Sequence, residues 1–286
     1  MRTVSIISDS TCDLSKELLE RYQITTFPLH IHLGEDEYSD GINITPEEIY
    51  AWSDANKKTP KTSVLSPFEA QECLKKQLAV SEEVICFCIS EEMSSCANVM
   101  RIAAEELEAE NRIWVVNSTN LSTGIGLQII EAAIMAEQGM KAQAIVDKIK
   151  ALQPQVRSSF VVDTLTYLHR GGRCSGLAAL AGSTLKLHPC ISVVDGKMQA
   201  GKKYRGKMKK VITDYVADLK PVLETARPER VFITHSGCEN EILEAVKAQL
   251  EEMHYFKEIF ITRAGSVITS HCGPGTLGVL FVAGNK

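Results

Sequence analysis

The sequence predicts an α/β fold in which two closely packed α/β domains share a ligand site in the crevice between them. Short apolar runs alternate with helix-length amphipathic segments along almost all of the 286 residues, the pattern of strands connected by helices. Strands that alternate with helices favour a parallel sheet covered on both faces. Hydroxyl-rich turns lie where these elements meet, and ligands of α/β proteins bind at such junctions.

The first domain is predicted to span residues 1–154. Strands are expected at 4–7, 26–33, 84–89 and 113–116. Helices are expected at 14–22, 66–78, 97–108, 123–138 and 142–152, and one more helix is expected to begin at residue 45. Asp13 is expected to cap the first helix, and 35–40 reads as a polar turn. Thr45 and Ser66 are each followed by proline and, three residues on, by glutamate, which is the signature of a capped helix start. The last helix ends before Pro154, where we place the domain boundary.

The second domain is predicted to span residues 155–286. Strands are expected at 158–162, 231–234 and 258–261, helices at 208–224 and 239–251, and a hairpin at 191–202. Asp195-Gly196 supports the hairpin, because Asp-Gly favours the two-residue turn that joins antiparallel strands. A glycine-rich turn at 170–173 follows the first of these strands.

The composition excludes several classes of function. A net charge of −5 argues against a nucleic-acid partner, because no basic excess exists to neutralise phosphates. The longest apolar runs, such as 127–135, are too short to cross a bilayer, and the N-terminus resembles no signal peptide, so we expect a cytoplasmic protein. The nine cysteines include no C-x-x-C pair, which favours buried thiols and no metal site. Cys12, Cys96 and Cys272 lie in loop-like motifs and are expected near the site.

Hydroxyl groups and one imidazole form the candidate site. Thr62 and Ser63 lie in one turn, Ser94 and Ser95 in a second, Ser118 to Ser122 in a third, and His271 in a C-terminal Ser-His-Cys-Gly-Pro-Gly segment. Such a neutral, hydroxyl-rich set suits one anionic ligand. The P-loop, G-x-S-x-G and H-E-x-x-H motifs are absent, and Gly124-Ile125-Gly126 lacks the third glycine of a dinucleotide site. We therefore expect binding without a catalytic residue. A phosphotransferase component, or a hydrolase that uses a serine with His271, stays open as an alternative.

Arg170 and Arg173 bracket a glycine pair. Two arginines in such a turn suit contact with a phosphate or an acidic partner, and a solvated turn is an equally good reading.

Taken in order, the motifs resemble the DegV family of bacterial fatty-acid-binding proteins along essentially the whole chain. The resemblance rests on Ser8-Asp9-Ser10, Thr62-Ser63 with Ser66-Pro67, the segments 89–94, 118–126 and 164–173, Asp195-Gly196, Tyr204-Arg205-Gly206 and the segment 271–275. It implies two α/β domains, a long-chain fatty acid buried between them as the only ligand, no cofactor, and a carboxylate held by hydroxyls. It also implies presentation of the bound acid to a separate fatty acid kinase, with at most transient membrane contact.

The resemblance assigns roles to individual residues. Thr62 is the hydroxyl expected in the first turn, Ser94 or Ser95 the one in the second, and His271 the histidine near the head group; Ser63 and Ser122 belong to the same hydroxyl turns. Arg170, Arg173 and Arg205 are candidates for contact with the kinase or with phosphate. The family has Ser-Gly-Thr where this chain has Ser94-Ser95-Cys96, so which serine faces the carboxylate stays open. It also has Ser-Gln-Pro-Ser where this chain has 63–66, Ser-Val-Leu-Ser.

Overall fold

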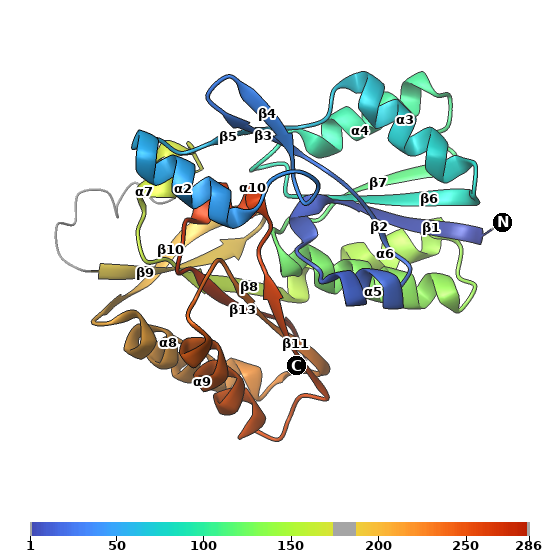
Figure 1. Ribbon diagram of the computed structural model, residues 1–286. Coiled ribbons are helices and arrows are strands. Elements are labelled where there is room, and N and C mark those ends of the chain that lie inside the picture. The colour runs from blue at the N-terminus through green and yellow to red at the C-terminus, as the bar shows by residue number, and fades with distance from the viewer. Residues whose placement is uncertain (1, 174–186, 285–286) are drawn as a thin grey trace.

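The computed structural model describes residues 2–173 and 187–284, and its first half is built on a parallel sheet (Figure 1). The strand order is β2-β1-β6-β7, and all three pairings are parallel. The strands are β1 (Arg2–Asp9), β2 (Thr25–Phe27), β6 (Ser81–Cys88) and β7 (Ile113–Asn117). Residues 84–88 of β6 are all buried, as expected of a strand covered on both faces.

Helices cover both faces of this sheet, as the sequence predicts. The helices of this half are η1 (Ser10–Cys12), α1 (Lys16–Arg21), α2 (Pro46–Asn56), α3 (Pro67–Leu78), α4 (Cys96–Glu106), α5 (Thr123–Glu137), α6 (Ala142–Leu152) and η2 (Gln153–Gln155). Figure 1 shows α3 and α4 on one side of the sheet and α5 and α6 on the other. The two predicted capping boxes are present, with Thr45 paired to Glu48 and Ser66 paired to Glu69.

The second half is built on a mixed, mainly antiparallel sheet of order β10-β9-β8-β13-β11-β12, in which β11 and β12 form the parallel pair. Its strands are β8 (Val156–Val161), β9 (Leu187–Val194), β10 (Lys197–Arg205), β11 (Ala226–His235), β12 (Glu258–Arg263) and β13 (Leu277–Ala283). Asp195 and Gly196 join β9 to β10 with positive φ angles of 49° and 78°, so the predicted hairpin is confirmed. Helices α8 (Met208–Leu223) and α9 (Asn240–Glu251) pack on this sheet.

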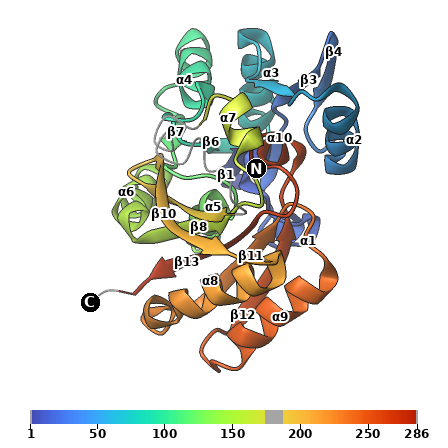
Figure 2. The same cartoon turned by 90° about the vertical axis from the view of Figure 1, so that its left-hand side faces the viewer.

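A small antiparallel sheet from the first half and two short helices from the second half lie where the two halves meet. The sheet has the order β4-β3-β5, with β3 (His30–Leu33), β4 (Asp36–Ser39) and β5 (Lys61–Ser63). The helices are α7 (Thr166–Arg170) and α10 (Ser266–Cys272). Although α10 lies near the C-terminus of the chain, it packs against α2, α7, β3 and β5 (Figures 1 and 2).

Three local expectations are wrong. The strand predicted at 26–33 is two strands in different sheets, because Pro28 lacks the N–H that a continuous ladder requires. Ser15, and not Asp13, caps α1; Asp13 has a φ of 52° and turns its carboxyl elsewhere. The polar turn predicted at 35–40 is largely β4. Sequence reasoning also did not identify α10 or β13 as elements.

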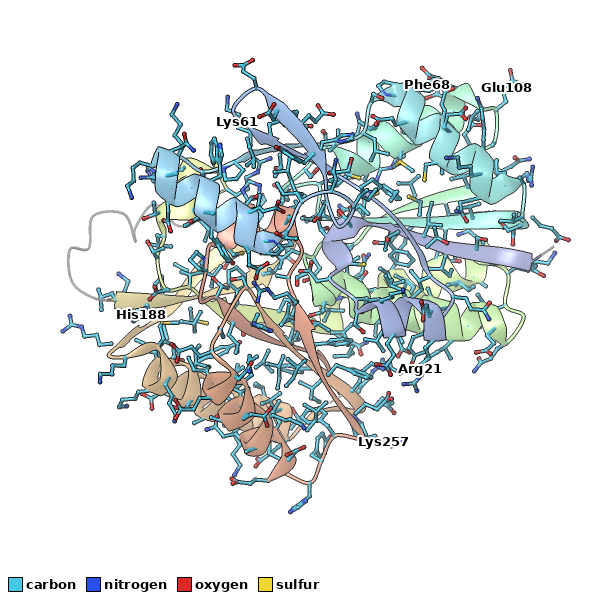
Figure 3. The ribbon with its side chains drawn as sticks, viewed as in Figure 1. Arg21, Lys61, Phe68, Glu108, His188 and Lys257 are labelled. Atoms are coloured by element: carbon cyan, nitrogen blue, oxygen red, sulfur yellow. The ribbon has the colours of Figure 1, made fainter. Side chains whose placement is uncertain are left out.

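The two halves of the chain meet over a broad interface. The sheets β2-β1-β6-β7 and β4-β3-β5 lie wholly before residue 154, and the six-stranded sheet lies wholly after residue 155. We therefore propose the division into domains 1–154 and 155–286. One core includes buried side chains from both halves, such as Ile125 of α5 and Phe160 of β8. Arg21, labelled in Figure 3, forms a 2.6 Å ion pair with Glu258 at the edge of this interface. That pair is solvent-exposed, so the apolar contacts supply most of the cohesion.

Candidate functional site

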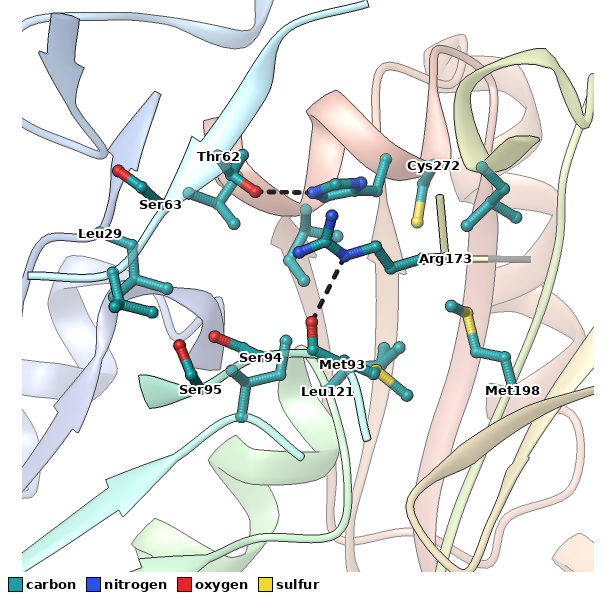
Figure 4. Close-up of a pocket in the computed structure, with 16 residues that line it drawn as sticks. Leu29, Thr62, Ser63, Met93, Ser94, Ser95, Leu121, Arg173, Met198 and Cys272 are labelled. Carbon is teal, nitrogen blue, oxygen red and sulfur yellow. Dashed lines mark hydrogen bonds between the residues drawn. The ribbon is translucent and has the colours of Figure 1, made fainter. Parts of the chain in front are cut away.

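A cavity of about 320 Å³ lies where β5, α10, the start of α4 and β10 converge (Figure 4). Its volume is at the lower end of the range typical of small-molecule sites. The cavity is lined by Leu29, Thr62, Ser63, Val64, Ile89, Met93, Ser94, Ser95, Leu121, Leu168, Arg173, Met198, Val267, Ile268, His271 and Cys272. These residues come from both halves of the chain, so the cavity exists only because the two halves pack together.

A threonine–histidine pair lies in one wall of the cavity. The Oγ1 atom of Thr62, on β5, is 2.9 Å from Nε2 of His271, on α10. The Nδ1 atom of His271 is buried and has no hydrogen-bond partner in the described part of the chain. An N–H at Nδ1 would therefore be unsatisfied, and we assign the proton to Nε2, which donates to Thr62. The hydroxyl proton of Thr62 is then free to donate to a ligand.

Two serines contribute hydroxyls from the beginning of α4. Ser95 is the N-cap residue of this eleven-residue helix, and its side chain makes no capping bond. The hydroxyl oxygen of Ser94 accepts a 3.3 Å bond from the N–H of Cys96. The N-terminus of a helix carries a partial positive charge, so this end of α4 favours an anion beside the two hydroxyls.

Arg173 adds a positive charge to the same cavity. Its Nε donates to the carbonyl of Met93 at 3.3 Å, as Figure 4 shows, and its Nη1 to the carbonyl of Gly171 at 2.8 Å. Burial, and then the charge of Arg173, lower the pKa of His271 to about 4, so the imidazole is neutral at pH 7. The expectation of a neutral site is thus wrong: Arg173 brings one formal positive charge to it.

Close packing behind the imidazole depends on Gly171. A Cβ atom at this position would lie 2.4 Å from Nδ1 of His271, nearer than any side chain tolerates. Gly171 has an ordinary φ of −75°, so the glycine is required by space and not by backbone conformation. The Gly171-Gly172 pair therefore has a packing role as well as a turn role.

Two buried carboxyl groups fix the helix that carries His271. Oδ1 of Asp13 accepts a bond from the N–H of Gly265, and Oδ1 of Asp40 accepts one from the N–H of Ser266, both at 2.8 Å. These donors belong to the N-cap residue and the first residue of α10, where backbone N–H groups lack partners within the helix. Burial raises the pKa of Asp13 to about 8.

The predicted site residues fall into two groups. Thr62, Ser63, Ser94, Ser95 and His271 all line the cavity, although the Ser63 hydroxyl pairs with Nε2 of His32 at 2.8 Å. Arg173, a candidate for contact with the kinase or with phosphate, lines the cavity as well.

The remaining candidates lie elsewhere. Ser122 is 4% exposed and donates to Asp13 at 2.5 Å, so its hydroxyl is not directed at the cavity. Arg170 and Arg205 are exposed, and Arg205 borders a separate surface groove with Lys202 and Lys203. Cys272 lines the cavity, whereas Cys12 and Cys96 lie in the core.

The apolar lining was not anticipated from sequence. Met93, Met198 and Leu168 come from three separate segments, and no local pattern connects them. Helix α10 does carry a signal: positions 267, 268, 271 and 272 have the spacing of one helix face, and all four residues line the cavity.

One buried group of side chains has the composition of a metal site. Ligand atoms of Asp9, Cys88 and Cys96 lie within 4.8 Å of one another. Asp9 already accepts bonds from the N–H groups of Thr11 and Ile89, at 3.0 and 2.7 Å. Burial raises the pKa of the Cys88 thiol, and the bond to Cys88 together with burial raises that of Cys96. Metals bind the deprotonated thiolate, which both raised pKa values disfavour. These contacts are those of a hydrogen-bonded core cluster.

Comparison with known proteins gives a consistent result. A family profile described as "Uncharacterised protein, DegV family" matches residues 3–284. A DegV domain-containing protein of Deinococcus radiodurans is 32% identical over 278 residues, which cover 97% of each chain. No helix in the described ranges combines the length and the hydropathy that a membrane span requires.

Solved structures with the same fold include proteins described as fatty acid binders. A DegV family protein from Thermus thermophilus, described by its fatty acid binding, superposes with a TM-score of 0.89 at 28% identity and covers 99% of this chain and 100% of its own. A stearic-acid-binding protein from Eubacterium ventriosum superposes with a TM-score of 0.84 at 27% identity and covers 98% of each chain.

Proposed function

The chain belongs to the DegV family, and we propose that it binds one long-chain fatty acid in the cavity between its two halves. One observation carries the proposal: hydroxyls, an imidazole and a guanidinium gather in part of a cavity whose other walls are apolar. A fatty acid has the same division into a charged head and an apolar chain. The fatty acid binding described for the Thermus thermophilus and Eubacterium ventriosum proteins supports the same class of ligand.

The head group would be held by donors that the free protein leaves available. The hydroxyl proton of Thr62, the hydroxyls of Ser94 and Ser95, and the guanidinium of Arg173 all face the space that a carboxylate would occupy. Hydrogen bonds to a charged group contribute about 1.5–3 kcal/mol each. The positive charge of Arg173 would offset the cost of transferring a carboxylate out of water.

The acyl chain would supply most of the affinity. Burial of one methylene contributes about 0.8 kcal/mol, so fourteen methylenes give a gross contribution of about 11 kcal/mol. Leu29, Ile89, Leu121 and Val267 are among the apolar residues available to contact it. In this division of roles, the polar residues orient the ligand and the apolar walls retain it.

Binding without turnover agrees with the geometry around His271. A nucleophile–base pair requires a third group that orients the imidazole, and the described residues offer no partner to Nδ1 of His271. With a pKa of about 4, His271 is also a weak base at neutral pH. The alternatives of a serine hydrolase and a phosphotransferase component gain no support from these contacts.

We further propose that the protein carries the acid to a separate fatty acid kinase in the cytoplasm. The carboxylate would lie beside Arg173, and Arg170 is exposed three residues earlier in the chain; both arginines are suited to an incoming phosphoryl group. The test incubates the loaded protein with ATP and a fatty acid kinase and traps acyl phosphate with hydroxylamine. Product that requires both proteins is expected. Product from this chain and ATP alone would make it an enzyme, and no product with the kinase would remove the carrier role.

A further inference from the structure

Two histidines and two glutamates gather on one face of the small sheet β4-β3-β5. His30 and His32 are two residues apart on β3, so their side chains lie on the same face. Glu37 of β4 is the cross-strand partner of His32 and shares this face. Glu69, from the first turn of α3, contacts His30 at the other end of the face. None of these four residues lines the cavity that holds the candidate site.

Both imidazoles are held through their Nε2 atoms. Nε2 of His30 lies 3.2 Å from one carboxylate oxygen of Glu69 and 3.3 Å from the other. Nε2 of His32 lies 2.8 Å from Oγ of Ser63. A carboxylate accepts hydrogen bonds, so we assign the proton of His30 to Nε2, and we assign His32 in the same way, with Ser63 as the acceptor. Nδ1 of each ring then carries a lone pair.

The two lone pairs face a hydrogen-bond acceptor. Nδ1 of His30 is 3.6 Å from Oε1 of Glu37, and Nδ1 of His32 is 3.7 Å from Oε2 of the same carboxylate. Neither distance is short enough for a hydrogen bond. Only 9% of the His30 side chain is exposed, and its Nδ1 has no hydrogen-bond partner among the described residues. A buried polar atom without a partner costs about 1–3 kcal/mol, and a cation between the rings and the carboxylate would remove that cost.

The separations of these atoms suit a metal ion. Zn²⁺ binds imidazole nitrogen and carboxylate oxygen at about 2.0–2.2 Å in tetrahedral sites, which places two ligand atoms about 3.3–3.6 Å apart. The side chains of Glu37 and His32 are 58% and 30% exposed, so both have room to close on an ion. Histidines that bind metals commonly donate their other N–H to a carboxylate or a similar acceptor, which orients the ring. Glu69 and Ser63 are such acceptors.

We propose that His30, His32 and Glu37 bind one divalent transition-metal ion of the zinc class, with water completing its coordination. Imidazole ligands favour zinc and similar metals over Mg²⁺ and Ca²⁺, which take oxygen ligands. Lys61 pairs with His32 across β5 and brings a positive charge to this face, but it is exposed and its flexible stem lets the ammonium extend into water.

A bound ion would brace the small sheet. It would join β3 to β4 directly, and the bond from His32 to Ser63 would extend the link to β5, the strand that carries Thr62. This metal site is independent of the proposed fatty acid binding, because its ligands lie outside the cavity.

The test titrates Zn²⁺ into purified full-length protein that a chelator has freed of metal, with isothermal titration for binding and melting temperature for stability. The wild type should bind one ion and melt at a higher temperature with zinc, since a ligand of the folded state stabilises that state. Glu37→Gln and His32→Gln, which each remove a ligand, should weaken binding at least a hundredfold. Glu69→Gln should weaken it about tenfold, because glutamine still caps α3 but no longer orients His30 with a negative charge.

Two control variants should bind zinc as the wild type does. His254→Gln removes an exposed histidine after α9, and Cys96→Ser removes a thiol of the buried Asp9, Cys88 and Cys96 group. Melting temperatures without zinc identify a variant that fails to fold, and either ligand variant alone is sufficient for the test. Wild-type protein that binds no zinc would overturn the proposal. Binding that persists in Glu37→Gln and His32→Gln, or that is lost in Cys96→Ser, would overturn it as well.

Discussion

Oγ1 of Thr62 and Nε2 of His271 lie 2.9 Å apart, although 209 residues separate them in the chain. β5 brings the threonine to this contact by pairing with β3, and α10 brings the histidine by packing on the same small sheet. The pair therefore forms only when the last helix of the chain docks on its first half. Head-group binding and the packing of the two halves are consequently coupled.

Thr62→Ala and Ser94→Ala should weaken fatty acid binding about tenfold each, because each removes one hydrogen bond to a charged group. Both should reduce phosphorylation by the kinase more than they reduce binding, since the carboxylate loses its orientation. Isothermal titration and the hydroxylamine assay measure the two effects. Ser63→Ala is the matched control, because the Ser63 hydroxyl pairs with His32. Full kinase turnover in both variants would exclude these hydroxyls as carboxylate ligands.

Shortening the acyl chain of the ligand should weaken binding more than removing the charge of its head group. Loss of four methylenes should weaken binding about two hundredfold, at about 0.8 kcal/mol each. A fatty alcohol of the full length should lose less, because it keeps the whole apolar contact and still hydrogen-bonds to the hydroxyls. Competition assays on delipidated protein compare the two ligands. A short acid that outcompetes the full-length alcohol would reverse the assigned roles.

Gly171→Ala should abolish head-group orientation without straining the backbone. The new methyl group would lie 2.4 Å from Nδ1 of His271 and displace the imidazole from Thr62. Gly172→Ala is the contrasting variant: nothing lies within 4 Å of the added methyl group, but its φ of +70° disfavours alanine. We expect kinase turnover to fall in the first variant, and thermal stability to fall without loss of turnover in the second. Equal kinase turnover in Gly171→Ala and Gly172→Ala would contradict a clash between the added methyl group and His271.

Asp13 should make the protein less stable as pH rises from 6.5 to 8. Its pKa is 3.8 in the unfolded chain and about 8 in the folded one, so the folded state binds more protons and loses stability as they dissociate. The free energy of unfolding is expected to fall by roughly 1 kcal/mol per pH unit in this range. The histidines with lowered pKa, His235 and His271, act in the opposite direction, because the unfolded imidazoles bind protons around pH 6.5 that the folded ones do not. The difference in slope between the wild type and a variant without the Asp13 carboxyl therefore isolates the effect of Asp13.

Asp13→Asn tests this assignment, since an amide keeps an acceptor for the N–H of Gly265 but does not ionise. Urea unfolding at pH 6.5, 7.2 and 8 should show a flatter profile for the variant than for the wild type. If the free energy of unfolding changes with pH in the same way in Asp13→Asn and in the wild type, Asp13 does not hold its proton in the folded protein.

The sequence predicts elements with strong local signals and misses those that depend on distant partners. The capping boxes at Thr45 and Ser66 and the Asp195-Gly196 turn involve contacts within a few residues, and all three are present. By contrast, β5 has three residues and forms by pairing with β3, and α10 is held by Asp13 and Asp40 from the other end of the chain. No local propensity encodes such contacts.

The candidate site shows the same limit. The hydroxyls of Thr62, Ser94 and Ser95 are recognisable because their motifs are local, and the structure brings them to one cavity. Ser122 looks equivalent in sequence, but its hydroxyl is used by Asp13, 109 residues away. Arg173 looks like a surface residue of a glycine turn, and only tertiary packing turns it toward His271.

Native mass spectrometry of the purified protein, followed by extraction and identification of any bound molecule, decides whether the protein is a fatty acid carrier. We expect one long-chain fatty acid per chain, retained through purification because its acyl chain is buried. An empty protein that also takes up no added fatty acid would exclude fatty acid binding as its function.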